Sequence, residues 1–281
     1  VVRDGDDLRG ANALAAMPNN PEVTEIAGLT QQAVGEMNQA ETTFGKLIGL
    51  QPRSAVPYFR LANVQAATGN KIGAAENLRK ALQAKPDYVD AQRALIMLSV
   101  AGGKTREALD IAKEMQRQSP KSPSGHVFEG EIYVATKAFK EAASAYRTAL
   151  KLSPATEIAK RLHASLLWSG NKAEADKFSA SWTAEHPKDF GFRGHLADTA
   201  AGNRDFAGAI KIYRSLLELQ PDNAQILNNL AWTATQIKDP LALEYAEKAN
   251  RLSPDNPVFL DTLALAFAEG GNAKKAVETE R

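Results

Sequence analysis

The sequence predicts an all-α fold, an α-solenoid built from stacked helix-turn-helix units. Three regularities predict it: a proline recurs every 33 or 34 residues, an alanine lies twelve residues before each later proline, and a leucine lies twelve or thirteen residues before most of these alanines. Stacked units must begin and end in register to bury each other's apolar faces, whereas a single globular core imposes no such period. The positions are Pro18, Pro52, Pro86, Pro120, Pro154, Pro187, Pro221 and Pro254; Ala40, Ala74, Ala108, Ala142, Ala175, Ala209 and Ala242; and Leu61, Leu95, Leu162, Leu196 and Leu230.

Residues 55–88 illustrate one unit. Apolar residues recur at helical spacing over 57–68, which predicts a first helix. Gly69 ends that helix, and a second helix is expected over 71–84 with Ala74 on its buried face. Pro86 stops the second helix because its ring clashes with the preceding turn. A small residue at position 74 lets the two helices approach closely, and a larger one would cost roughly 1–3 kcal/mol.

This pattern resembles the tetratricopeptide repeat, a 34-residue helix-turn-helix unit. The resemblance is carried by Tyr58, Leu61, Ala62, Ala74, Leu78 and Pro86 in one unit, by Gly130, Tyr133, Ala142, Tyr146 and Pro154 in another, and by Gly28, Ala40, Phe44 and Pro52 in the first. One unit departs from it, since Ser179 stands where an aromatic residue is usual, with Phe178 and Trp182 nearby. The resemblance implies a right-handed superhelix that is a single domain over residues 1–281.

The repeated positions divide the chain into units over 21–54, 55–88, 89–122, 123–155, 156–189, 190–223 and 224–256, followed by a partial unit over 257–281. Residues 1–20 are expected to form the second helix of a preceding, truncated unit. Because both ends fall within a unit and residue 1 is Val, we expect the chain to be part of a longer array.

Composition is that of a globular chain: 44% of residues are hydrophobic, 24% are charged, and the net charge is +1. The sequence contains no run of about 18 apolar residues, so it predicts no membrane span. The near-zero net charge gives no case for nucleic-acid binding. Charge is uneven, at −3 over residues 1–54, +6 over 55–155 and −2 over 224–281. A solvated outer face explains the basic stretch, and an acidic partner is the alternative.

The sequence shows no pattern typical of catalysis. The chain has no cysteine, and none of His126, His163, His186 and His195 has another histidine at metal-binding spacing. His163 falls on a buried helix face, which favours a hydrogen-bonded packing role. The glycine pairs 102–103 and 270–271 are expected to be turns between helices rather than phosphate-binding loops. We therefore predict a non-enzymatic protein with no cofactor and no metal.

In the tetratricopeptide family the first helix of each unit lines the concave groove that binds a partner. Transferring those positions to this sequence assigns the groove to Phe59, Arg60, Asn63, Arg93, Met97, Lys160, Arg161, Trp168, His195, Asp198, Asn228, Asn229 and Trp232. Amide side chains can bond an extended peptide and aromatic rings can fill pockets. The alternative is that many of these residues pack between units. The Lys-Asn-Asn-Lys-Arg clamp that holds a carboxylate in chaperone-binding members is absent; Arg60, Asn63 and Arg93 only approximate it.

The second half of the chain resembles a narrower family, the tetratricopeptide-repeat lipoproteins of the bacterial PEP-CTERM/exosortase system. The segments that carry this resemblance are 186–189, 196–197, 210–213, 227–232, 242–249, 253–254 and 261–263. Ala264 stands where that family often has glycine. The resemblance implies a role in exopolysaccharide production and protein sorting. It also implies a periplasmic or outer-membrane-associated lipoprotein, anchored by lipid outside this sequence; without the resemblance a cytoplasmic location is expected.

Two functions remain open at this point. The first is an interaction scaffold that binds a protein or peptide segment in the groove. The second is a periplasmic protein that binds polysaccharide and assists exopolysaccharide assembly or export. The segment around Asn228 and Trp232 is where a partner is most expected, because the spacing of the prolines shortens there.

Overall fold

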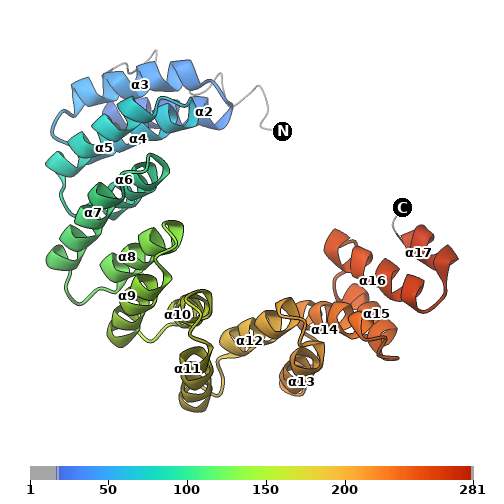
Figure 1. Cartoon of the computed structure of the whole chain (residues 1–281). Helices are drawn as coiled ribbons and strands as arrows, with labels where there is room; N and C mark the ends of the chain where they lie inside the picture. The colour runs from blue at the N-terminus through green and yellow to red at the C-terminus, as the bar shows by residue number, and fades with distance from the viewer. Residues whose placement is uncertain (1–16, 18, 280–281) are drawn as a thin grey trace. The chain divides into compact units, whose positions relative to one another are not determined.

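The protein is helical throughout the part that the structure describes, which comprises residue 17 and residues 19–279 of a computed structural model. Sixteen helices and no strands occur in these residues, and successive helices form antiparallel pairs (Figure 1). This confirms the predicted all-α solenoid. The helix expected within residues 1–20 lies outside the described residues, apart from the loop that contains Met17, Asn19 and Asn20.

The chain forms two compact units, the first ending at Ser153 and the second beginning at Pro154. Each contains eight described helices. In the first unit these are α2 (Pro21–Ala33), α3 (Met37–Leu50), α4 (Ala55–Ala67), α5 (Lys71–Ala84), α6 (Val89–Ala101), α7 (Thr105–Gln118), α8 (Ser124–Ala135) and α9 (Phe139–Leu152). In the second they are α10 (Thr156–Trp168), α11 (Lys172–Glu185), α12 (Phe190–Gly202), α13 (Phe206–Leu217), α14 (Ala224–Gln236), α15 (Ala242–Leu252), α16 (Pro257–Glu269) and α17 (Ala273–Thr279).

The periodic residues occupy equivalent structural positions. Every proline of the series from Pro52 onward lies in the loop that follows an odd-numbered helix, where it prevents the helix from continuing. The seven periodic alanines are buried, six of them completely. Of the periodic leucines, four are buried and Leu196 is half-buried. The sequence period therefore marks helix ends with proline and close helix contacts with alanine.

The turns within the eight helix pairs share one backbone feature, a residue in the left-handed region. Five turns use glycine for it, at Gly35, Gly69, Gly103, Gly170 and Gly271. The other three use Lys137 (φ 61°), Arg204 (φ 63°) and Lys238 (φ 56°), for which the side chain makes this conformation costly. The turns expected at glycines 69, 102–103 and 270–271 are thus confirmed.

Two helix pairs are held by a glycine against an aromatic ring. A Cβ atom on Gly28 would lie 2.6 Å from the Phe44 ring, and one on Gly130 would lie 2.6 Å from the Tyr146 ring. Both rings are buried. These glycines are required for space rather than for backbone conformation, because any side chain would displace the ring.

The proline interval that ends at Pro254 is one residue shorter than most, and the structure shows where the residue is missing. The linker between α14 and α15 is not shortened; it runs over residues 237–241, against 68–70 between α4 and α5. The residue is lost instead from α15, which has 11 residues where α5 has 14. Asp239 directly precedes Pro240, and a residue before proline is disfavoured in the helical conformation. The helix α15 therefore starts later. The Asp239 carboxylate accepts a hydrogen bond from the Leu241 N–H at 2.9 Å.

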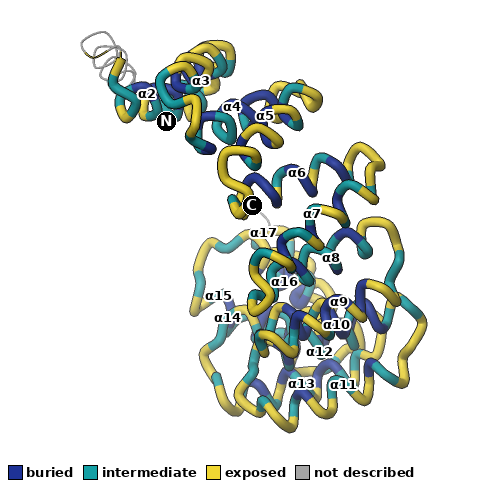
Figure 2. Tube along the Cα trace, turned by 90° about the vertical axis from the view of Figure 1, so that its left-hand side faces the viewer, coloured by how far each residue is buried: buried dark blue, intermediate teal, exposed yellow. Residues whose placement is uncertain are grey.

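Within each unit the core is a chain of overlapping clusters rather than one centre. In the first unit one cluster joins α3 to α4, a second joins α4 to α6, and a third joins α6 to α8. In the second unit clusters join α12 to α15 and α14 to α16. Figure 2 shows buried residues along the helix faces that meet and exposed residues concentrated in the loops. Each helix pair is therefore stabilised by its neighbours, as expected for repeats.

Candidate binding pocket

The predicted groove residues of the first unit mostly make contacts between repeats. The Phe59 ring packs against the Tyr88 ring at a centroid distance of 5.1 Å. Arg60 on α4 forms an ion pair with Glu25 on α2 at 3.0 Å. Asn63 is half-buried, whereas Arg93 and Met97 on α6 are exposed. The structure places these five residues on two successive repeats, in α4 and α6, and none of them lines a pocket described here.

In the second unit the predicted residues of α10 also stay apart from a pocket. Lys160 pairs with Glu157 one turn earlier on the same helix, at 2.8 Å. Arg161 is exposed, and the Trp168 side chain is 56% exposed at the end of the helix. None of these three residues lines either of the two pockets described below.

His195 has a packing partner that the sequence did not predict. The Nδ1 atom of His163 on α10 lies 3.0 Å from the Nε2 atom of His195 on α12, so one ring donates to the other. His163 is buried, which confirms its expected packing role, and its ring meets the Phe192 ring edge-on at 5.9 Å. Burial, and next the neighbouring His195, lower the pKa of His163 to about 4. Burial and next Lys160 also lower the pKa of His195. The pair is therefore neutral at neutral pH.

Four of the predicted residues meet in one place. Asp198 from α12 and Asn228, Asn229 and Trp232 from α14 line a pocket of about 380 Å³, together with Ala201, Gly202, Tyr213, Thr233, Val258 and Thr262. We call it the Asp198 pocket. Its walls come from α12, α13, α14 and α16, so three successive repeats build it. The volume lies within the range of about 300–1,000 Å³ that is usual for ligand sites.

A hydrogen-bond network fixes one wall of this pocket. The Tyr213 hydroxyl donates to Oδ1 of Asp198, and Nδ2 of Asn229 donates to the same oxygen at 3.2 Å. Burial, and next the bond to Asp198, raise the pKa of Tyr213, which keeps its hydroxyl protonated as a donor. In the described residues no lysine or arginine pairs with Asp198, and Asp198 is the one charged residue among those that line the pocket. The pocket therefore carries an uncompensated negative charge.

Asn228 occupies a different position from the exposed one predicted for a groove residue. It is 4% exposed, and its Oδ1 atom has no hydrogen-bond partner. A buried carbonyl oxygen without a donor costs free energy, on the order of 1–3 kcal/mol. Asn228 also lines the Asp198 pocket, but its Oδ1 atom is itself buried and does not face a ligand there.

An aromatic and an aliphatic side chain are exposed at this pocket. The Trp232 side chain is 42% exposed, and its ring is held edge-on against Phe206 at 6.3 Å. Val258 on α16 is 60% exposed. Tyr213 and Thr262 fall within segments 210–213 and 261–263 of the narrower resemblance, but neither they nor Val258 belong to the groove that the sequence predicts. The aromatic position of the repeat could have indicated Tyr213, because its hydroxyl reaches the preceding first helix.

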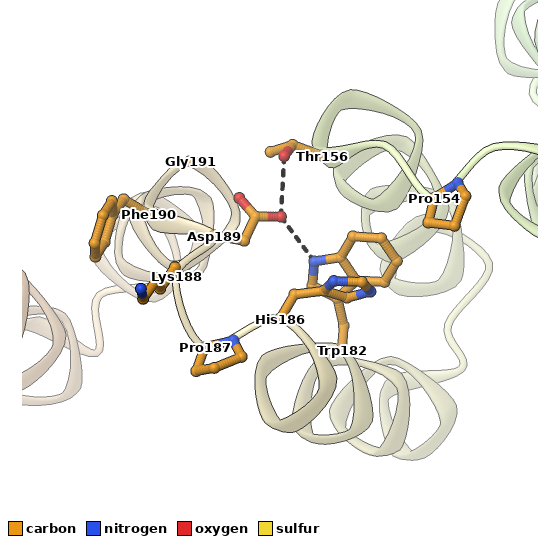
Figure 3. A pocket seen from close by; sticks show the side chains of 9 residues that line it. All are labelled: Pro154, Thr156, Trp182, His186, Pro187, Lys188, Asp189, Phe190 and Gly191. Carbon is orange, nitrogen blue, oxygen red and sulfur yellow. Dashed lines mark hydrogen bonds between the residues drawn. The ribbon is translucent and has the colours of Figure 1, made fainter.

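A second pocket lies beside the loop between α11 and α12. Figure 3 shows that Asp189 is its central polar residue, with Trp182, His186 and Thr156 around it. Oδ2 of Asp189 accepts hydrogen bonds from Trp182 Nε1 at 2.9 Å and from Thr156 Oγ1 at 3.0 Å. Its Oδ1 accepts from the Phe192 N–H at 2.9 Å and caps α12. Both oxygens thus serve the fold, and this pocket has no comparable unsatisfied group for a ligand.

The described residues contain no cluster of three or more side chains suited to hold a metal ion. Among the described helices, none is both long enough and apolar enough to cross a membrane. What the Asp198 pocket can do chemically is bind a donor-rich group. It offers the Asp198 carboxylate and the indole face of Trp232.

Paired helices in a repeating series, with a pocket built across three successive pairs, define a helical-repeat protein of the solenoid class. Within that class the chain belongs to the tetratricopeptide repeat family, whose model matches residues 59–123, 93–157 and 196–257, more than half of the chain.

The chain is similar to one curated protein, the cellulose synthase operon protein C of Pseudomonas fluorescens (strain SBW25). The two are 23% identical over 310 residues, an alignment that covers all of this chain and 24% of the relative. The chain thus spans about a quarter of that protein's length.

Two solved structures are similar in fold. A tetratricopeptide repeat protein from Parabacteroides merdae ATCC 43184 is 15% identical with a TM-score of 0.52, covering 88% of this chain and 98% of that one. A MamA protein structure is 16% identical with a TM-score of 0.50, covering 61% of this chain and 94% of that one. At these identities the similarity concerns the fold alone. Family membership makes a role in protein interaction the expected one.

Proposed function

We propose that this chain is a non-enzymatic scaffold that holds an extended segment of a partner protein along the first helices of its repeats, in a bacterial system that makes or exports exopolysaccharide. The observation that carries the proposal is the Asp198 pocket, where four residues assigned from family geometry meet. Amide groups and an exposed aromatic ring are suited to an extended chain, because they bond its backbone and hold its side chains.

The exopolysaccharide setting rests on two similarities. The curated relative is named for a cellulose synthase operon, and the second half of the chain resembles lipoproteins of the PEP-CTERM/exosortase system. A periplasmic or outer-membrane-associated location, with a lipid anchor outside this sequence, belongs to the same proposal. Deleting the gene and complementing it with the Asp198→Asn variant tests it: secreted polysaccharide should fall in both strains, and unchanged secretion would contradict it.

Site-specific photo-crosslinking in cells tests the scaffold itself. A photoreactive phenylalanine analogue at Val258, which lines the pocket and is 60% exposed, should capture one defined protein. The same analogue at Lys211, an exposed residue of α13 that does not line the pocket, serves as the control. Equal capture from both positions, or none from Val258, would contradict a partner at this pocket.

Polysaccharide binding is the second candidate function. It is favoured by the exposed rings of Trp232 and Trp168, since indole faces stack on sugars and neighbouring amides bond hydroxyl groups. Titration with defined oligosaccharides, followed by tryptophan fluorescence of wild type and Trp232→Phe, separates the two. A saturable change that disappears in Trp232→Phe would favour the sugar.

A further inference from the structure

We infer that the Asp198 pocket accepts a single basic side chain, an arginine of the partner segment, whose guanidinium bonds Asp198 and lies against Trp232. This inference rests on the proposed scaffold function and names the chemistry that the pocket selects. Two independent features of the pocket support it: the charge of Asp198, whose second oxygen has no partner among the described residues, and the exposed ring of Trp232.

The negative charge of the pocket favours a cationic ligand. Asp198 receives two neutral donors, Tyr213 and Asn229, and both bond the same oxygen, Oδ1. The other oxygen, Oδ2, has no partner among the described residues. A neutral ligand that covered this carboxylate would remove water from it without offsetting the charge, which is unfavourable.

The free carboxylate oxygen favours a ligand that carries several N–H groups. A guanidinium has five N–H groups in a planar fork, which matches a carboxylate and can also lie flat against a ring, whereas the ammonium of lysine is a compact point charge.

The exposed ring fits a flat cation. Trp232 is fixed by Phe206 and leaves 42% of its side chain exposed. Guanidinium groups stack on indole faces more readily than other cations in proteins, and tryptophan is the most favourable ring. Val258 can contact the methylene groups of the same side chain.

A matched set of peptides tests the inference. The probes are acetyl-Ala-Arg-Ala-amide and the same peptide with citrulline, which has nearly the same shape but no charge. The indole N–H signal of Trp232, assigned with Trp232→Phe, is followed by NMR during titration. We expect the arginine peptide to shift Trp232 and not Trp168, with an affinity at least tenfold above that of the citrulline peptide.

The Asp198→Asn variant should reduce arginine-peptide binding at least tenfold, while Asp261→Asn, an exposed carboxylate on α16 outside the pocket, should not change it. If Asp198→Asn disturbs the fold, seen as altered helical circular dichroism, Trp232→Ala provides the second test and should abolish binding. Equal binding of both peptides, or full binding by a folded Asp198→Asn, overturns the inference. A glucose oligomer that shifts Trp232 when the arginine peptide does not would overturn it in favour of sugar.

The arginine pocket and the proposed scaffold function can fail independently of each other. If the arginine peptide fails to bind while a photoreactive group at Val258 still captures a protein, the scaffold function stands and the arginine pocket is wrong. If the peptide binds but no protein is captured in cells, the pocket chemistry stands and the proposed scaffold function is wrong.

Discussion

The helix pair α8–α9 and the segment α10–α12 solve the same packing problem differently. In α8–α9 the regular small residue and the regular aromatic residue meet as Gly130 and Tyr146, and the two helices pack closely. In α10–α11 the aromatic position holds Ser179, and the helices pack less closely. The rings of Phe178, Trp182, Phe192, His163 and His195 lie between these helices and α12. A repeat can therefore lose its usual contact if neighbouring rings fill the space, and here the substitute includes a buried histidine, His163, and a half-buried one, His195.

The largest expected effect concerns the centre of this aromatic cluster. Phe192 is completely buried and contacts four other rings. Phe192→Ala should lower the free energy of unfolding by about 3–5 kcal/mol, because it removes a large buried side chain and leaves a cavity. Denaturant unfolding measures the loss, and hydrogen exchange should locate it in α10–α12. Equal exchange along all helices would contradict the picture of locally stabilised repeats.

Acid should weaken α10–α12 more than α8–α9. The folded pKa of His163, about 4, lies below its ordinary value of 6.5, so the unfolded state binds more protons between these values. This contribution to stability is complete above about pH 6.5 and declines as the pH falls toward 4. The loss should be on the order of 2 kcal/mol by pH 4.5.

Other charged groups influence the same pair. Asp176 and Lys172 act on His163, and Lys160, Asp198 and Glu157 act on His195. Carboxylates elsewhere also titrate in acid. Unfolding free energies at pH 7.5, 6 and 4.5 should therefore be compared between wild type and the double variant His163→Gln with His195→Gln. If both lose the same stability, the histidine pair is not responsible.

The regular pair should be sensitive to a single methyl group. Gly130→Ala places a Cβ atom 2.6 Å from the Tyr146 ring and should cost about 1 kcal/mol, since overpacking exceeds the gain in helix propensity. Gly45→Ala is the matched control, because nothing lies within 4 Å of its added Cβ. That variant should instead stabilise α3 by about 0.5–1 kcal/mol. Thermal unfolding of both variants measures the two changes in stability. A change of the same sign in both variants would refute the role of the Tyr146 ring.

The smallest expected effect on stability concerns the residue in the left-handed conformation, which is glycine in five of the turns within helix pairs and not glycine in three. Arg204→Gly and Lys238→Gly should each stabilise the second unit by about 0.5 kcal/mol, because relief of the left-handed conformation exceeds the added entropy of the unfolded chain. Lys137→Gly should do the same in the first unit. The reverse change, Gly170→Lys, should destabilise by a similar amount. Melting temperatures of the four variants test this, and no difference between the forward and reverse changes would contradict it.

Much of the fold was predictable because each repeat encodes its own boundaries. Pro86 and Gly69 end helices through local backbone chemistry, and Ala74 marks a close helix contact, so none of these needs information from distant residues. The spacing of the prolines shows that a residue is missing before Pro254 but not that it is missing from α15. The position of the missing residue depends on how Asp239 and Pro240 delay the helix, and spacing alone does not show it.

The candidate site was predictable in part. Family geometry found Asp198, Asn229 and Trp232, which lie on successive first helices. It also offered Arg60 and His195, which the structure pairs with Glu25 and His163 instead. The choice between an accessible and a paired side chain depends on which residue faces it from the next repeat. That relation spans about one repeat in sequence and has no local signal.

The sequence by itself determined the period, the helix ends and the small residues of this protein, because each follows from backbone geometry within a single repeat. Only the tertiary structure decided that Asp198, Asn228 and Trp232 share one pocket and that the Asn228 carbonyl there lacks a donor. Whether a polar group is satisfied depends on every atom around it in three dimensions, whereas a helix end depends on a few residues along the chain.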